Sequence, residues 1–165
     1  GGTENVAFMA GMGKAAELVG MNLMKNAQHM ETMRSRLLGN LQLQLGKDKL
    51  RVNGPSTEAA RLPNTLSVGL KDIESGTLLN EVGNNVAASA GAACHSSGGG
   101  VSAILQAMQV PMEYARGTLR LSLGPSTTVE EVDKASEILC EAATRQWASS
   151  ETQAVQAGDT SRTAQ

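Results

Sequence analysis

Apolar residues recur every three or four positions from about Val6 to Leu45, which is the spacing of one face of a helix. Gly11, Gly13 and Gly20 weaken that helix locally, since each glycine costs about 1 kcal/mol relative to alanine. We therefore predict a long first helix that is bent or broken near Gly20. The apolar stripe comprises Phe8, Met12, Ala15, Ala16, Val19, Leu23, Ala27, Met30, Leu37, Leu38 and Leu41.

Shorter patterns in the middle of the chain are typical of strands. Residues 65–70 and 118–124 alternate apolar and small polar side chains, which predicts strands with one buried face. Residues 49–53 predict a further short strand, because Gly54 and Pro55 mark a turn directly after them.

A second long helix is predicted from about residue 129 to Trp147. Residues 127–131 carry two overlapping capping-box patterns, which indicate where this helix begins. Beyond Trp147 the chain is rich in Ser, Thr, Gln, Ala and Gly without an apolar stripe, so residues 149–165 are predicted to be a disordered tail. The alternation of helices and strands indicates an α/β or α+β fold.

Composition restricts the function classes. The 165 residues are 41% apolar and 18% charged, which is typical of one soluble globular domain. A net charge of -2 and only three aromatic residues argue against nucleic-acid binding. No apolar run approaches the roughly 20 residues that a membrane helix needs. The first residues show neither an initiator Met nor a signal-peptide pattern, so we expect the sequence to be part of a longer protein.

The two cysteines have different surroundings. They are too few for a disulfide framework, and their spacing predicts no metal site. Cys140 falls near the apolar stripe of the last helix, so it is predicted to be a core residue. Cys94 lies among Gly, Ala and Ser residues, without a bulky neighbour to bury it, and such a segment suits delivery of a reactive thiol. The adjacent His95 is either a solvent-exposed residue or a proton donor to the same reaction.

Arg120 is the second candidate for chemistry. It is predicted to lie on the strand face opposite Leu119, Leu121 and Leu123. A guanidinium there is either a solvated arginine or a planar fork for a carboxylate. The flanking Thr118 and Ser122 are predicted to keep this face small, which would leave room for the ligand. Residues 1–3 precede a helix and are a weaker candidate for holding an anion.

Several segments together resemble one family, the class V aminotransferase-like enzymes that use pyridoxal 5'-phosphate (PLP). Within it, the chain is most similar to cysteine desulfurases and selenocysteine lyases, over residues 1–147. The segments that carry the resemblance, in chain order, are residues 1–5, 64–70, 89–96, 118–124 and 126–133.

The resemblance implies the C-terminal small domain of a fold-type-I enzyme with its connecting helix. Residues 1–48 would be the helical connection from a large PLP-binding domain, and residues 49–148 the small α/β domain. The lysine that holds the cofactor lies upstream of residues 1–3 in such enzymes, so this chain alone would not bind PLP covalently.

The resemblance also implies roles for individual residues. Cys94 would be catalytic, carrying sulfur as a persulfide in a desulfurase or assisting release of selenium in a lyase. Arg120 would bind the substrate carboxylate, and Thr3 would reach the cofactor phosphate of the neighbouring subunit in a homodimer. His95 remains a candidate proton donor.

Residues 92–96, Ala-Ala-Cys-His-Ser, favour a selenocysteine lyase, which converts L-selenocysteine to L-alanine with release of selenium. A cysteine desulfurase is the first alternative, and a truncated, catalytically inactive interaction fragment is the second. A selenium or sulfur acceptor protein is a further expected partner, whereas nucleic acid and membrane are not expected. The expected compartment is the cytoplasm, with the mitochondrion as the alternative.

Overall fold

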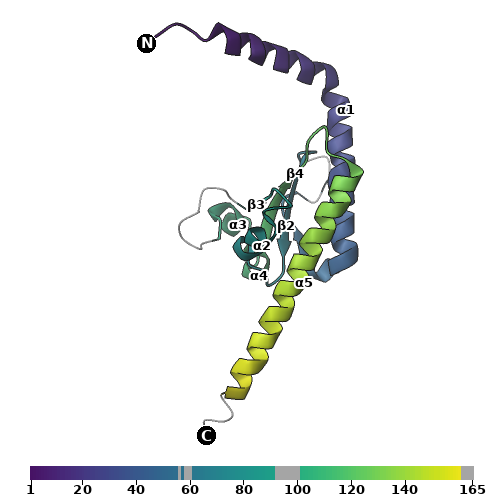
Figure 1. Ribbon diagram of the computed structural model, residues 1–165, viewed down its shortest axis with the longest axis vertical. Coiled ribbons are helices and arrows are strands. Elements are labelled where there is room, and N and C mark those ends of the chain that lie inside the picture. The colour runs from purple at the N-terminus through teal and green to yellow at the C-terminus, as the bar shows by residue number, and fades with distance from the viewer. Residues whose placement is uncertain (56, 58–60, 92–100, 161–165) are drawn as a thin grey trace.

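The computed structural model describes residues 1–55, 57, 61–91 and 101–160 (Figure 1). The predicted α+β class is confirmed: the described residues contain an antiparallel sheet of four strands in the order β1-β2-β4-β3, with helices packed on it. The elements are α1 (Val6–Leu45), the 3-10 helix η1 (Lys47–Lys49), β1 (Leu50–Val52), β2 (Thr65–Leu70), α2 (Ser75–Val82), β3 (Ser89–Ala90), α3 (Ala103–Ala107), α4 (Met112–Ala115), β4 (Thr118–Ser122) and α5 (Val129–Thr160).

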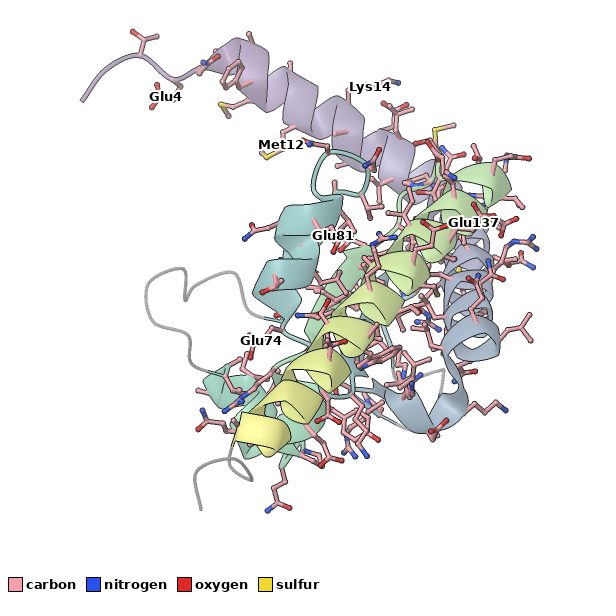
Figure 2. All side chains as sticks on the ribbon, turned by 60° about the horizontal axis from the view of Figure 1, so that its bottom comes forward. Glu4, Met12, Lys14, Glu74, Glu81 and Glu137 are labelled. Carbon is pink, nitrogen blue, oxygen red and sulfur yellow. The ribbon has the colours of Figure 1, made fainter. Side chains whose placement is uncertain are left out.

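Helix α1 is continuous over 40 residues. It begins at Asn5, whose side-chain oxygen accepts a hydrogen bond from the backbone N–H of Phe8 at 3.1 Å. It is not broken but changes direction in its N-terminal half, which projects away from the sheet (Figure 1). Figure 2 shows Met12 on this projecting part, where its side chain is 71% exposed. The C-terminal part of α1 instead runs along the body of the protein.

The apolar core lies on one face of the sheet. Leucines and valines that pair across β1, β2 and β4 all point to this face, for example Leu66 opposite Leu121 and Val68 opposite Leu119. The C-terminal part of α1, together with α2 and α5, covers them. The buried helix residues include Met33, Leu37, Leu41, Leu45, Leu78, Val82, Val132, Leu139, Ala142 and Ala143.

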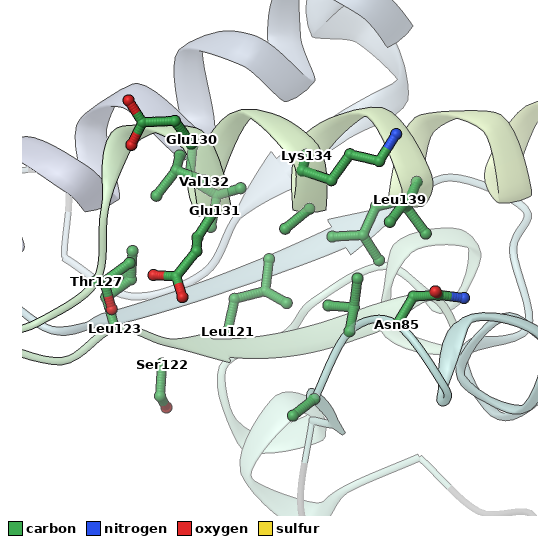
Figure 3. A pocket seen from close by; sticks show the side chains of 15 residues that line it. Asn85, Leu121, Ser122, Leu123, Thr127, Glu130, Glu131, Val132, Lys134 and Leu139 are labelled. Atoms are coloured by element: carbon green, nitrogen blue, oxygen red, sulfur yellow. The ribbon is translucent and has the colours of Figure 1, made fainter.

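A cavity of about 550 Å³ lies between α5 and β4 (Figure 3). Leu121 and Leu139 are among its apolar lining, and the charged side chains Glu130, Glu131 and Lys134 all come from α5. Arg120 does not line it. The cavity is therefore a hollow on the core side of the sheet.

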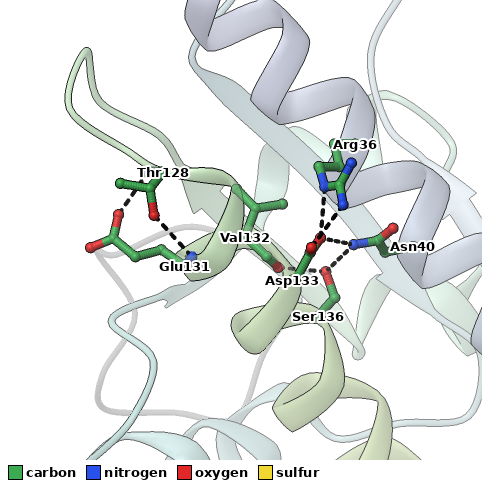
Figure 4. Close-up of polar contacts among 7 residues, drawn as sticks. All are labelled: Arg36, Asn40, Thr128, Glu131, Val132, Asp133 and Ser136. Carbon is green, nitrogen blue, oxygen red and sulfur yellow. Dashed lines mark hydrogen bonds and ion pairs between the residues drawn. The ribbon is translucent and has the colours of Figure 1, made fainter.

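The start of α5 is fixed by side-chain hydrogen bonds (Figure 4). The backbone N–H of Glu131 donates to the Thr128 hydroxyl at 3.1 Å, and the backbone N–H of Thr128 donates to the Glu131 carboxylate at 2.9 Å. This reciprocal pair is the predicted capping box. The following turn pairs with α1, because Arg36 donates two hydrogen bonds of 2.7 Å to the Asp133 carboxylate. The hydrogen bonds from Arg36, and then that from Asn40, hold the pKa of Asp133 below its ordinary value.

The end of α5 differs from the prediction. The helix continues to Thr160 instead of ending near Trp147, so residues 149–160, predicted to be disordered, are helical. The two Ala, two Gln and one Glu of this segment have high intrinsic helix propensity, which does not require an apolar stripe. Residues 161–165 of the predicted tail lie outside the described residues, and the division into a connection and a small domain stays a prediction.

Gly117, just before β4, has no room for a side chain. A methyl group at this position would lie 2.1 Å from the backbone oxygen of Leu70, which cannot move without disturbing β2. We expect Gly117→Ala to lower the free energy of unfolding by about 1–3 kcal/mol, as overpacking does. Gly76→Ala in α2 is the matched control, because no atom lies within 4 Å of its added methyl group. Urea denaturation of both variants measures the difference, and equal stability would contradict the described packing.

Candidate functional site

The second face of the sheet is polar and carries Arg120. Residues that pair directly across antiparallel strands point to the same face, so Ser67, Arg120 and Ser89 form one row across β2, β4 and β3. The backbone N–H of Asn53 donates to the carbonyl oxygen of Ser67 at 2.9 Å, which extends this row past the end of β1. We call Asn53, Ser67, Arg120 and Ser89 the polar row.

Arg120 is the charged member of the polar row. It is exposed, and within the described part of the chain its guanidinium has no hydrogen bond or ion pair. Its neighbours in the row are both serines, whose side chains are short. The arrangement therefore offers a planar, permanently charged fork to an anion approaching this face.

Thr118 differs from the prediction for this face. The sequence suggested that Thr118 and Ser122 both keep the face open beside Arg120, but Thr118 is only 1% exposed. Its hydroxyl donates to the carbonyl oxygen of Tyr114 at 3.0 Å, because α4 lies over this end of the sheet. Gly69, opposite Thr118, allows this approach, since a methyl group there would lie 2.6 Å from the same oxygen. The open part of the face is the end with Ser122.

Cys94 and His95 lie outside the described residues. The chain that leads to them is placed beside Arg120. Ser89 is opposite Arg120, and the backbone N–H of Gly91 donates to the carbonyl oxygen of Thr118 at 3.0 Å. The structure therefore brings the residues just before the cysteine segment next to Arg120.

Thr3 is exposed and precedes α1 at the far end of the projecting helix (Figure 1). The structure does not bring it to the polar row. The contact between Thr3 and the cofactor phosphate of the neighbouring subunit in a homodimer stays a prediction.

Cys140 is a buried residue of α5, and its side chain contributes to the core. Burial raises the pKa of its thiol to about 11. A thiol of this kind is a poor nucleophile near neutral pH, because the thiolate is the reactive form.

The described residues do not form a complete PLP site. A PLP enzyme needs a lysine next to its substrate groups, yet all six lysines lie outside β2, β3 and β4. Four of them already have other partners. Lys14, Lys71 and Lys134 pair with Glu17, Glu113 and Glu137 at 2.9, 3.6 and 3.2 Å, and Lys49 lies 4.1 Å from the ring centre of Trp147. The cofactor therefore does not fit the residues of this chain taken alone.

Asn53 is a member of the polar row that the sequence pattern did not single out. Gly54 and Pro55 mark a turn directly after Asn53, which predicts only that a strand ends there. In the structure its side chain is buried and bridges two strands. Only the register of β1 with β2 reveals this position.

Comparison with known proteins identifies the class. Residues 1–135 match the family described as Aminotransferase class-V, and the chain belongs to this family, whose desulfurases and selenocysteine lyases depend on PLP. In the described residues no helix is long and apolar enough to cross a membrane.

Two curated relatives illustrate the similarity. The chain is 37% identical over 138 residues to "Cysteine desulfurase IscS" of Clostridium botulinum, which covers 83% of this chain and 34% of the relative. It is 39% identical over 135 residues to "Selenocysteine lyase" of Homo sapiens, which covers 80% of this chain and 30% of the relative. The chain thus spans about a third of the length of these relatives.

Solved structures agree with the described fold. A NifS-like protein superposes with a TM-score of 0.70 at 32% identity, over 86% of this chain and 34% of that one. A NifS-like protein from Rickettsia africae gives the same TM-score at 26% identity, covering 86% of this chain and 36% of its own. The helices and the small antiparallel sheet thus match those of part of a NifS-like protein.

The burial of Cys140 predicts slow chemical labelling. In a Cys94→Ser variant, Cys140 is the sole thiol, and with a pKa of about 11 only about 0.1% of it is thiolate at pH 8. We expect iodoacetamide at pH 8 to label the folded variant far more slowly than the same variant in urea, as followed by mass spectrometry. Equal rates in the two states would contradict the burial of Cys140.

Proposed function

We propose that the chain is part of a PLP-dependent selenocysteine lyase, which converts L-selenocysteine to L-alanine with release of selenium. The observation that carries the proposal is the polar row, in which Arg120 is exposed and forms no ion pair with the described residues. Arg120 lies directly opposite Ser89, which precedes the Cys94 segment. L-Selenocysteine has a carboxylate that Arg120 would bind and a selenium atom that would face the Cys94 thiol. The proposal thus assigns both groups that such a substrate needs to one surface.

Arg120 is the proposed ligand of the substrate carboxylate. Guanidinium and carboxylate form two parallel hydrogen bonds, which fix the orientation of the substrate as well as its position. Arg120 forms no ion pair with an acidic side chain of the described residues, which favours this role. The flanking serines of the polar row leave space for the small substrate.

Cys94 is the proposed thiol of the reaction, and His95 the proposed proton donor. Chain length supports the assignment, because the three residues from Gly91 to Cys94 span at most about 11 Å. Gly91 is hydrogen-bonded to Thr118, two residues before Arg120 on the same strand. A thiol delivered from this segment remains close to a substrate held by Arg120.

PLP is the proposed cofactor, and it supplies the electron sink for the bond that breaks at the substrate. Because no lysine of this chain lies on the strands of the polar row, the activity is proposed for a longer polypeptide that also provides the cofactor lysine. Within such a protein, residues 1–48 would form the connection and residues 49–148 the small domain. A homodimer in which Thr3 contacts the cofactor phosphate of the partner is part of the same proposal.

A cysteine desulfurase is the second candidate, in which Cys94 carries sulfur as a persulfide to an acceptor protein. The 37% identity to the Clostridium botulinum desulfurase favours it about as much as the human lyase favours the first candidate. The two activities differ in the atom released. An inactive interaction fragment is the third candidate, favoured by the lack of a fitting lysine.

The test is release of alanine by the longest natural polypeptide that contains this sequence, loaded with PLP. We expect alanine from L-selenocysteine in excess over that from L-cysteine, and loss of most selenium release in Cys94→Ala. Faster alanine release from L-cysteine, with a persulfide on Cys94 by mass spectrometry, would favour the desulfurase instead. No alanine from either substrate would overturn both enzymatic candidates.

Arg120→Gln removes the charge and the fork while keeping an amide. We expect KM for the amino acid to rise about 10-fold to 100-fold, because hydrogen bonds to charged groups contribute about 1.5–3 kcal/mol. Steady-state kinetics measures this rise. Arg145→Gln is the control. Arg145 is also exposed, but it lies on α5, which covers the opposite face of the sheet, and it pairs with Glu81 of α2 at 2.7 Å. An unchanged KM in Arg120→Gln would refute the carboxylate assignment.

A further inference from the structure

Asn53 is an unusual residue for the position it occupies. Asn53 is only 8% exposed, although Asn is a strongly polar residue. It lies directly after the three-residue strand β1. Its Nδ2 donates to the hydroxyl of Ser67 at 3.2 Å and to the hydroxyl of Thr118 at 3.3 Å. One carboxamide therefore ties β2 to β4 on the polar face of the sheet.

The two hydroxyls that Asn53 contacts both border Arg120. Ser67 is directly opposite Arg120 in the register of β2 and β4. Thr118 lies two residues before Arg120 on β4, and side chains two positions apart on a strand share one face. The amide of Asn53 therefore holds the two residues next to the base of the arginine side chain.

The same amide is not fully satisfied. The Oδ1 atom of Asn53 is buried and has no hydrogen-bond partner among the described residues. Asn53 and Ser67 are among the residues that line a small cavity of about 200 Å³. An unsatisfied buried polar atom is costly and rare in native proteins, and a functional role is one explanation for it. An apolar residue at position 53 would avoid that cost, so stability alone does not account for Asn53.

We propose that Asn53 is a positioning residue for Arg120. By fixing Ser67 and Thr118, it holds β4 and the arginine in the place where the substrate carboxylate binds. This inference rests on the proposed function for the identity of the ligand, but its geometry rests on the polar row alone. Asn53 itself does not touch the substrate; it acts through the residues on either side of Arg120.

A double-mutant cycle tests the proposal in the PLP-loaded longer polypeptide. We expect Asn53→Ala to raise KM for the amino-acid substrate about tenfold with kcat nearly unchanged, because coupled neighbours interact measurably. In the Arg120→Gln background the same substitution should change KM less than twofold, about the precision of such a measurement. Additive effects of the two substitutions would overturn the proposal.

Asn40→Ala is the matched control for a merely structural effect. Asn40 also donates two hydrogen bonds from its Nδ2, at 2.8 Å to Asp133 and 3.3 Å to Ser136, but it does so between α1 and α5. Asn40→Ala should lower stability in urea without raising KM. If Asn53→Ala behaves in the same way, Asn53 is a structural residue and the proposal is wrong.

Equilibrium binding separates this inference from the proposed function. L-Alanine carries the carboxylate, and ethylamine is the same molecule without it. We expect Asn53→Ala to weaken binding of L-alanine about tenfold only when Arg120 is present, and to leave binding of ethylamine unchanged. Such a result, together with no alanine release by the unsubstituted protein, would refute the proposed function but support the inference about Asn53. Equal L-alanine binding with and without Asn53 would sink the inference whatever the activity.

Discussion

The pairing of β2 with β4 is the constraint on which the rest of the structure depends. Leu66 pairs with Leu121 and Val68 with Leu119, so the apolar side chains of both strands face α1, α2 and α5 together. Side chains alternate along a strand, so a slip of one residue would turn Arg120 into the core and Leu121 to solvent. The burial of the leucines thus fixes the outward direction of the arginine, and the candidate site follows from the core.

Burial of an apolar face also holds helix α1 against the sheet, but only over part of the length of the helix. Its apolar stripe is buried at Leu37 and Leu41 and continues without interruption to Leu23 and Met12, which are 56% and 71% exposed. An apolar surface of this extent is typical of a contact region rather than of free solvent. Only the C-terminal part of the stripe therefore packs on the described sheet. The N-terminal part of the stripe contributes no buried residue to the core of the sheet.

Strands and helix starts could be predicted where a local pattern carries the information. Alternation located β2 and β4, and the capping box at Thr128 and Glu131 located the start of α5. The end of α5 at Thr160 could not be found this way, because residues 149–160 have no apolar stripe and a composition that is also typical of disordered segments. Thr118 could not be predicted to be buried either, since its cover comes from Tyr114 on α4 and not from its own strand. The role of Asn53 depends on two strands at once, so no pattern within one segment reveals it.

Strand β4 separates the residues that stabilise the fold from the one that is available for binding. Leu119 and Leu121 are 1% and 5% exposed and fill the core, and burying each such side chain contributes about 1.5–3 kcal/mol. Arg120, between them, is exposed and forms no ion pair within the described residues, so its charge contributes little to folding. Replacing it removes the proposed anion ligand without removing a hydrogen bond or an ion pair of the described residues. A kinetic defect at this position can then be assigned to lost binding, whereas a defect at either neighbouring leucine would combine binding with unfolding.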